Sequence, residues 1–492
     1  MKKSKLLAIA AIGAAGSATA FCGFYVAKAD ATLFNDRSEV ILVRDGRMTT
    51  ITMSNDFKGD VKDFAMVVPV PTVLRESDIR IVERRVFDAL DSYSSPRLVE
   101  YHDENPCQQW EYAEEMDALA PMSRVASAEM VRRESRAKDH GVTIEATYTV
   151  GEYDILILGA TESRGLKQWL LDNGYKIPAT AHEVLDPYIK SGLKFFVVKV
   201  DLARMQAAGF EFLRPIQVSF ESDKFMLPIR LGMANSSGTQ DMIVYAFTRT
   251  GRVEAVNYRT VNVPTDRNIP LFAKERFGPF YKDVFGRAWK REGRNAVMLE
   301  YAWNVTPSWG GMKCDPCVGP PPMPREFAEA GVSWANNGGA QVFFTRLHVR
   351  YGRDKFPQDL VFQVTPNTTH FQARYVLTHP AKGDLSCNEG QDYLETLYHK
   401  RQRELDELVA LTGWDVSGHG NYLHEVKRQL SPERRNGLLP AVTPGPDDKG
   451  APPSSGPEGT PGEWLLLLGL LALLGVGTWF LPRVSAPRAM EL

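Results

Sequence analysis

The sequence has little cysteine and no surplus of positive charge. Five of its 492 residues are Cys, and 60 acidic residues slightly outnumber 58 basic residues, giving a formal net charge of −2. Proteins that bind nucleic acid usually carry a basic surplus or a basic stripe, and no basic tract with interleaved aromatic residues occurs here. The composition therefore argues against nucleic acid as a partner.

The compact motifs of common enzyme classes are also missing from the sequence. Neither glycine-rich phosphate-binding pattern stands at Gly159, no G-x-S-x-G nucleophile elbow occurs, and the Asp-rich turn 56–63 lacks the ligand spacing of a calcium loop. No H-E-x-x-H occurs, although His419 and His424 beside Glu425 leave a weak metal site as an alternative. We expect no cofactor, assign no catalytic residue, and leave open whether the chain is an enzyme.

Long apolar runs are scarce, with one exception near the C-terminus. Residues 464–481 form a stretch of 18 residues without a charge, close to the ~20 that span a bilayer as a helix. Arg483 and Arg488 follow it, and basic residues resist translocation. We therefore expect a transmembrane helix over 464–481 and a cytoplasmic tail over 482–492. A buried core helix and a sorting signal that is later removed are the alternatives.

The N-terminus indicates export. Three lysines at positions 2, 3 and 5 precede a short apolar run, and Ala18-Thr19-Ala20 is a small-x-small cleavage site, which together predict a signal peptide over 1–20. Cys22 leaves a lipid anchor as an alternative, and an uncleaved N-terminal anchor is another. With the C-terminal helix, this places the chain in the cell envelope, outside the cytoplasmic membrane.

Between these segments we expect an exported domain over 21–436 and a stalk over 437–463. In the stretch 440–463, twelve of twenty-four residues are Pro or Gly, a composition typical of extended linkers. The domain exceeds the ~250–300 residues at which single cores tend to split, so one large domain or two joined subdomains are expected. The segment 108–140, rich in Glu, Arg and Ala, is expected to be a solvated helix or an insertion.

Alternating apolar residues predict many short strands with a few helices between them. The fold class is therefore α+β, a mainly antiparallel β-sheet with packed helices, plus the one C-terminal transmembrane helix. The expected strands are 39–43, 48–53, 64–71, 98–101, 153–158, 195–200, 216–220, 225–231, 242–248, 253–263, 296–305, 342–351, 360–364 and 373–377. The expected helices are 86–92, 165–173, 181–190, 280–290 and 391–412.

The helix expected over 391–412 has the clearest pattern. Five leucines mark an apolar stripe, and charged residues mark the opposite side, which we expect to face solvent. Gly413 is expected to cap the helix, and Trp414 to fold back onto the core. The charged residues of that side are Arg401, Arg403, Glu404, Asp406 and Glu407.

The cysteines offer the most compact candidate site. Disulfides are the default in exported proteins, and the candidates are Cys107, Cys314, Cys317 and Cys387. Cys314 and Cys317 enclose Asp315 and Pro316, so a redox-active pair is one alternative. A zinc site completed by Cys107 and Cys387 is another. Structural disulfides, within this loop or to the two distant cysteines, are favoured, with Cys22 left unpaired.

Several short segments, in this order, resemble the bacterial exported family called domain of unknown function 2330. They are FCGFYVAKAD, RDGRMTTITMSNDFKGD, FAMVVPVPTVL, RLVEYHDENPC, LPIRLGM and LTGW, and they extend from Phe21 to about Trp414. The resemblance implies an exported or membrane-anchored bacterial protein and brings no activity, cofactor or catalytic residue. It fits a structural role for Cys22, Cys107 and Cys387.

These observations favour a membrane-anchored binding or structural module of the cell envelope. Its partners would be the membrane, through the C-terminal helix, and an envelope protein or polymer. The alternative is a membrane-tethered hydrolase, or a thiol oxidoreductase that uses the loop of Cys314 and Cys317.

Overall fold

The computed structural model describes residues 24–27, 38–54, 64–108, 141–173, 181–210, 213–235, 238–306, 321–337 and 340–438. Two compact units divide the chain, Met1–Leu439 and Pro440–Leu492, and the described residues all belong to the first. No helix among them is long and apolar enough to span a membrane. The segment 464–481 lies outside the described residues.

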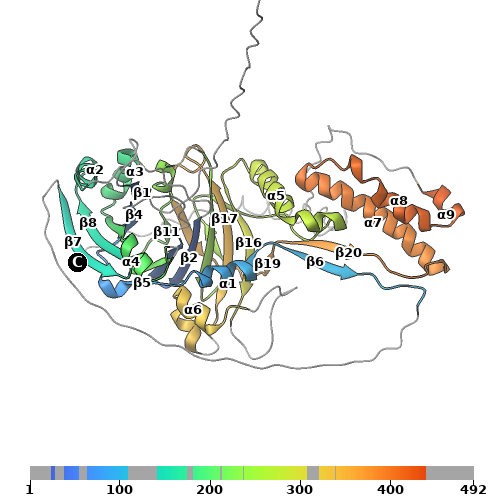
Figure 1. The fold of residues 1–492 in the computed structure, drawn as a ribbon, viewed down its shortest axis with the longest axis horizontal. Coiled ribbons are helices and arrows are strands. Elements are labelled where there is room, and N and C mark those ends of the chain that lie inside the picture. The colour runs from blue at the N-terminus through green and yellow to red at the C-terminus, as the bar shows by residue number, and fades with distance from the viewer. Residues whose placement is uncertain are drawn as a thin grey trace, which may run out of the picture. The chain divides into compact units, whose positions relative to one another are not determined.

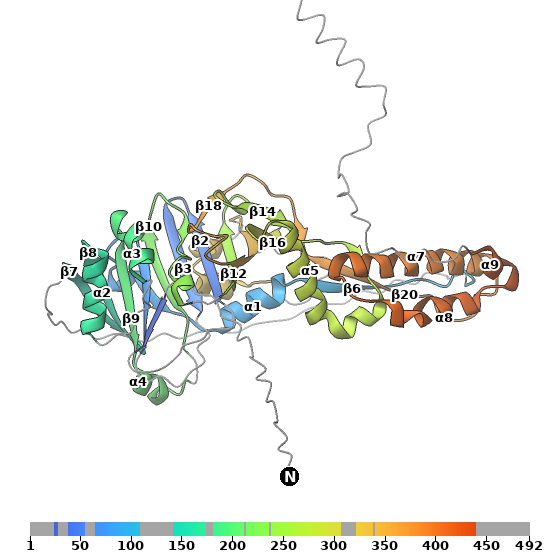
Figure 2. The ribbon, with the colours of Figure 1, turned by 90° about the horizontal axis from the view of Figure 1, so that it is seen from above.

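Two sheets stacked face to face form the centre of the first unit (Figures 1 and 2). The five-stranded sheet has the order β1 (Phe24–Ala27), β4 (Phe64–Val70), β9 (Lys194–Val200), β8 (Tyr153–Ala160), β7 (Val142–Val150). The nine-stranded sheet has the order β14 (Arg259–Asn262), β16 (Ala296–Asn304), β17 (Phe343–Tyr351), β12 (Gln240–Thr248), β2 (Ser38–Asp45), β3 (Met48–Ser54), β10 (Ile216–Glu221), β5 (Ile79–Ile81), with β19 (Phe371–Gln372) beside β16. Their facing side chains make the largest core, which includes Leu42, Val68, Ile155 and Val198.

Helices cover the outer face of each sheet. On the five-stranded sheet, α2 (Ser163–Asp172) packs through Leu166, Trp169 and Leu170, whose i, i+3, i+4 spacing places them on one helix face. Beside it, α3 (Ala181–Lys190) packs through Leu185 and Tyr188. On the nine-stranded sheet, α1 (Arg85–Ser94) and α6 (Pro324–Ala330) cover the opposite face. The first unit is therefore a four-layer arrangement of helix, sheet, sheet and helix.

The hairpin of β2 and β3 confirms the strands expected from the sequence. Asp45 pairs with Met48, so Gly46 and Arg47 form a two-residue loop. Gly46 has a φ of 58°, which the first central residue of a type II′ hairpin turn requires and which glycine adopts without strain. β2 also pairs in parallel with β12, so this hairpin lies in the middle of the large sheet.

Among the described residues, Pro69 lies where β4 has a neighbouring strand on one side only. It pairs with Phe195 of β9, whereas the pairing with β1 ends at Val67. A proline has no N–H for a ladder bond, so it fits this edge.

Two small sheets and a helical segment complete the described chain. One sheet has the order β11 (Met226–Leu227), β18 (Leu360–Val364), β13 (Val253–Ala255), and the other has the order β15 (Arg267–Asn268), β20 (Arg374–His379), β6 (Arg97–His102). The helical segment contains α7 (Asn388–Thr412), α8 (Asn421–Gln429) and α9 (Pro432–Gly437). In both ribbon views α7 and α8 lie along β6 and β20 (Figures 1 and 2).

The remaining elements are short or link these layers. α5 (Phe277–Arg291) packs on β20 and α7 through Phe280 and Val284. The others are α4 (Leu202–Ala207) and the 3-10 turns η1 (Glu76–Asp78), η2 (Gly232–Asn235), η3 (Leu271–Arg276), η4 (Ser333–Asn337) and η5 (Ser417–His419).

The α+β class is therefore confirmed for the described residues, in which antiparallel pairs predominate. Parallel pairs join β2 to β12, β14 to β16, and both neighbours to β20. Gly413 ends α7 with a φ of 75° as expected, and Trp414 packs against Phe280.

Two expectations about elements are wrong, and one helix was not expected. The strand expected over 225–231 is only β11, because Arg230 turns to an ion pair with the buried carboxylate of Asp359. The strand expected over 253–263 is divided into β13 and β14. The helix α6 was not expected from the sequence, and it begins at Pro324, which occupies the first helical turn where proline is tolerated.

The charged side expected for α7 is wrong at two residues. Arg401 and Glu404 are 2% and 1% exposed, because α8 packs over them. Nη1 of Arg401 donates to Glu404 at 2.8 Å, and the hydroxyl of Tyr422 on α8 donates to Glu404 at 2.6 Å. A buried pair of this kind keeps the charges compensated.

Candidate functional site

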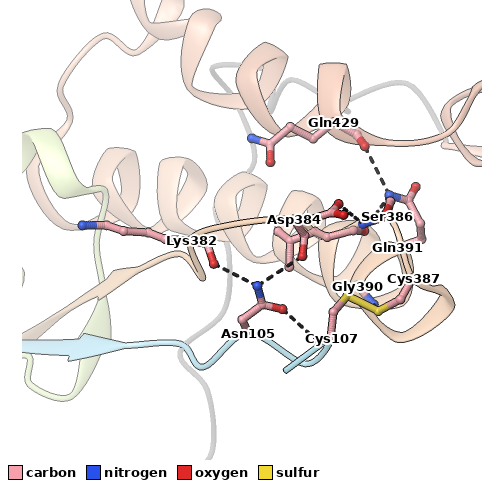
Figure 3. The surroundings of a disulfide bond; sticks show 10 residues. Asn105, Cys107, Lys382, Asp384, Ser386, Cys387, Gly390, Gln391 and Gln429 are labelled. Carbon is pink, nitrogen blue, oxygen red and sulfur yellow. Dashed lines mark hydrogen bonds between the residues drawn. A yellow bond between two sulfur atoms is a disulfide. The ribbon is translucent and has the colours of Figure 1, made fainter. Parts of the chain in front are cut away.

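A disulfide between Cys107 and Cys387 joins the end of β6 to the start of α7 (Figure 3). The two residues are 280 positions apart in the chain. Asn105 connects the two segments that carry the cysteines. Its Nδ2 donates to the carbonyls of Lys382 and Asp384 at 2.9 and 3.1 Å, and its Oδ1 accepts from the N–H of Cys107 at 2.8 Å. The bond confirms two of the four candidate cysteines as a structural pair.

Gly390 allows the disulfide to lie against the first turn of α7. A Cβ at this position would stand 2.7 Å from Sγ of Cys107 and 2.5 Å from the carbonyl oxygen of Leu385. Its N–H donates to Sγ of Cys387 at 3.2 Å, so Cys387 acts as the N-cap of the helix. The glycine is needed for space, since its neighbours include backbone.

The disulfide decides between the alternatives for the other cysteines. A sulfur in a disulfide is not a thiolate and cannot bind zinc, so the zinc site completed by Cys107 and Cys387 is wrong. Bridges from Cys314 or Cys317 to these two residues are excluded for the same reason. Cys22, Cys314 and Cys317 themselves lie outside the described residues.

The histidines singled out in the sequence do not form a metal site. Within the described part of the chain, no three His, Cys, Asp or Glu side chains are grouped so that they could hold a metal ion. The ring of His419 stacks on Phe272 with centroids 3.9 Å apart, and His424 lies on α8. The ring contact of His419 therefore packs the turn η5 against η3.

A buried charged network, which the sequence analysis missed, lies on β16, β17 and β12. Glu300 is 1% exposed and occupies a bulge of β16. Nδ1 of His348 lies 2.8 Å from Glu300, and Nε2 lies 3.1 Å from Asp241. Arg346 donates to Glu300 at 2.6 Å, and Arg350 donates to Asp241 at 2.8 Å.

The charges of this network stabilise one another. Burial opposes the charged form of His348, but Glu300 and Asp241 outweigh it and raise the pKa of His348. Burial also opposes ionisation of Glu300, yet His348 and Arg346 lower its pKa to about 2. Both ring nitrogens of His348 face carboxylates, so the imidazolium donates to both.

From Arg346 the network continues to the outer helix. Nη1 of Arg346 donates to Asp91 on α1 at 2.8 Å. The hydroxyl of Tyr245 lies 2.9 Å from Glu39 and 3.0 Å from Asp91, and Arg84 pairs with Glu39. This chain of contacts fastens α1 to the sheet, which indicates a structural role.

An open cavity lies beside the tip of the β2–β3 hairpin. Its volume is about 410 Å³, within the range of small-molecule sites. The lining comes from the hairpin, from the segment before β11, from the end of β12 and from the end of β18. These residues are Arg44, Asp45, Gly46, Asp223, Phe225, Thr248, Arg249, Thr250, Phe362, Gln363 and Val364.

Aromatic rings and paired charges give the cavity two kinds of surface. Phe225 and Phe362 are 5% and 4% exposed, with ring centroids 5.5 Å apart. Arg249 donates to both oxygens of Asp45 at 2.6 Å, and these hydrogen bonds lower the pKa of that carboxyl. Arg249 also lies 4.6 Å above the ring of Trp334, and this contact helps to hold the Arg249 side chain in the cavity wall.

The lining also carries hydroxyl groups and carboxylates. Its hydroxyl groups belong to Thr248 and Thr250, and Thr248 donates to the carbonyl of Gly251 at 2.5 Å. Its carboxylates belong to Asp45 and Asp223, and none of the described lining residues is His, Cys or Ser. The two strands of the hairpin were expected from the sequence, but the four segments that line the cavity are distant in the chain, and no local pattern marks them.

Comparisons with known proteins give one match. No curated protein and no solved structure is similar enough to the chain to count as a match. The model of a bacterial family matches residues 16–363, well over half of the chain, and this is the family that the ordered short segments resemble. The matched range includes the hairpin, β11, β12 and most of β18, and therefore almost all of the cavity lining. The chain belongs to the family described as "Uncharacterized protein conserved in bacteria (DUF2330)".

Proposed function

We propose that this protein is an exported binding module of the bacterial cell envelope, and that it takes a small ligand into the cavity beside the β2–β3 hairpin. The observation that carries the proposal is the cavity itself. Its aromatic floor, formed by Phe225 and Phe362, and its charged wall converge on one open space. Ligand sites typically combine an apolar lining with a few oriented polar groups.

The disulfide supports the location. Disulfides persist in oxidising compartments outside the cytoplasm, and the bond between Cys107 and Cys387 holds segments that are 280 residues apart. The signal-like segment 1–20 and the apolar segment 464–481 complete the proposal: an exported domain on a stalk, anchored by one C-terminal helix. An envelope polymer or protein is the expected source of the ligand.

The experiment compares the full chain with a variant whose cavity is blocked. Thr250 is exposed at the mouth, so Thr250→Trp fills the opening with little effect on the core. Thr143→Trp, at an exposed position of the edge strand β7, is the matched control. Each protein is incubated with the small-molecule fraction of cell envelopes, and bound compounds are identified by native mass spectrometry.

We expect a compound bound to the wild-type chain and to Thr143→Trp, and not to Thr250→Trp. A compound that Thr250→Trp retains would place the binding elsewhere. If no compound from the extract binds any of the three proteins, the proposed binding function is contradicted.

A further inference from the structure

Arg44 differs from the other arginine that lines the cavity, because within the described residues it forms no salt bridge, although the charge of Asp223 acts on it. Arg249 is paired with Asp45, and Asp223 is paired with Arg47 at 3.1 Å. The guanidinium of Arg44 donates to neutral acceptors, namely the carbonyl of Arg47 at 3.1 Å and the hydroxyl of Thr49 at 2.5 Å. Among the described charged residues of this lining, Arg44 is therefore the one outside a salt bridge.

Two N–H groups of Arg44 are available to a ligand. A guanidinium has five N–H donors. Nη1 uses both of its donors on Arg47 and Thr49, and Nη2 uses one in a long contact of 3.4 Å with the carbonyl of Asp223. Nε and the second N–H of Nη2 make no hydrogen bond within the described part of the chain. Nε and Nη2 are neighbours on a guanidinium, and this edge is one of those that can bind a carboxylate with two parallel hydrogen bonds.

The ring of Phe225 extends this site on the apolar side. Cζ of Arg44 lies 5.4 Å from the centroid of Phe225, and Phe362 continues the floor. Val364 at the rim is 37% exposed. A ligand that pairs with Arg44 therefore places its adjoining carbon groups on aromatic and aliphatic side chains, whose contact area favours an aryl or branched alkyl group.

The acidic residues of the lining set the charge of the ligand. Asp45 and Asp223 both face the cavity. A dianion such as a phosphate monoester would be repelled by both, whereas one negative charge is balanced by Arg44. The lining therefore selects a monoanion.

We propose that the cavity binds a monocarboxylate that carries an aryl or branched alkyl group, with the carboxylate on Arg44 and the apolar group on Phe225 and Phe362. This inference rests on the proposed binding function and specifies its ligand. Free carboxylic acids and the carboxyl ends of envelope-derived small molecules share this chemistry.

The test uses three probes that differ in their polar end. Hydrocinnamate carries the carboxylate, hydrocinnamamide replaces it with a neutral amide, and phenyl phosphate replaces it with a dianion. Each is titrated into the full chain in detergent by isothermal calorimetry, and Thr250→Trp supplies the blank for partition into detergent. Arg44→Gln removes the charge, and Arg80→Gln makes the same change at an exposed position of β5.

We expect hydrocinnamate to bind with a dissociation constant on the order of 1 mM. The amide, the phosphate and the Arg44→Gln protein should each weaken binding at least about tenfold, as loss of a charge-assisted hydrogen bond does. Arg80→Gln should leave the affinity unchanged. The probe comparison on the wild-type chain needs no variant, so it stands even if Arg44→Gln is unstable.

Two results separate this inference from the proposed function. If the amide or the phosphate binds as tightly as the acid, and Thr250→Trp blocks it, the cavity binds ligands but the monocarboxylate assignment is overturned. If hydrocinnamate gives no heat with the wild-type chain at about 10 mM, the assignment is also overturned. The comparison with envelope extracts then decides the proposed function independently.

Discussion

His348 shows how a histidine can be a fixed charge inside a sheet. It lies between Glu300 and Asp241, at 2.8 and 3.1 Å, while Phe285 stacks on its ring with centroids 3.8 Å apart. Alternating polar residues on β17, which are Arg346, His348 and Arg350, usually indicate a solvated strand face. Here α1 and α5 lie over that face, and the charges compensate one another instead of facing water.

Replacing His348 with Gln should destabilise the protein in a pH-dependent way. The pKa of His348 is raised in the folded state, so its contribution is fully present below the unfolded value of about 6.5 and is lost as the pH rises through the folded pKa. We expect the free energy of unfolding to fall by about 2 kcal/mol near pH 5.5, and by less near pH 9. Urea unfolding at the two pH values measures the difference.

The control is His424→Gln, which changes an exposed histidine of α8. It should leave stability within about 0.5 kcal/mol at both pH values. A loss in His348→Gln that is the same at both pH values would show that the imidazole contributes through packing on Phe285 and not through its charge. The pH dependence of the contribution from Glu300 is the opposite of that from His348. The pKa of Glu300 is lowered to about 2, so its contribution to stability is lost as the pH falls toward that value.

Arg401 and Glu404 allow a test of a buried pair on one helix. Glu404→Ala leaves the guanidinium of Arg401 buried with the carbonyl of Thr378 and Tyr422 as neutral acceptors, and we expect a loss of about 3 kcal/mol in unfolding free energy. The double variant Arg401→Met with Glu404→Leu removes both charges and should recover most of this loss. Chemical unfolding of the single and double variants gives the coupling.

Arg403→Ala serves as the reference for this pair, because Arg403 is exposed on the same helix. It should change stability by less than about 0.5 kcal/mol. If the double variant is as unstable as Glu404→Ala, the packing of α8 depends on the shape of these two side chains and not on their charges.

At the scale of elements, the sequence predicted those whose pattern is local. The strands β2 and β3 and the helices α2 and α7 were all expected, because each depends on the spacing of apolar residues within one segment. The cavity was not, since its lining comes from four separate segments that only the sheet order brings together. Arg401 and Glu404 were assigned to the solvent side, because the sequence of α7 alone does not indicate that α8 packs over them.

The disulfide connects two elements whose association has a large entropic cost. Closing a loop of 280 residues constrains the unfolded chain, and such bonds typically contribute about 2–5 kcal/mol. Cys107→Ser with Cys387→Ser should therefore lower the melting temperature and expose α7 and α8 to proteolysis first. Thermal unfolding followed by circular dichroism, with peptide mapping of early cleavage sites, tests this.

The matched variant is Cys314→Ser with Cys317→Ser. It should retain the peptide that links Cys107 to Cys387 in a non-reducing digest. If the link is absent from the wild-type chain purified from the envelope, the bond does not form in the cell and the support for an oxidising location is removed.

At the scale of the whole molecule, the first unit should fold without the second. Its sheets and helices enclose their own cores, from the sandwich of β2, β4, β8 and β9 to the packing of α7 on α8. In the sequence, the first unit ends at Leu439 and the second begins at Pro440. A chain that ends after Leu438 should therefore unfold at the same temperature as the full chain. It should also be recovered in the aqueous fraction after cell fractionation, while the full chain stays with the membrane, because only the full chain carries the apolar segment 464–481.

The two readouts are independent. Equal melting temperatures with both chains on the membrane would place the anchor before residue 439, where Cys22 and the N-terminal apolar run are the candidates. A shorter chain that melts earlier would mean that residues after Leu438 contribute to the fold of the first unit.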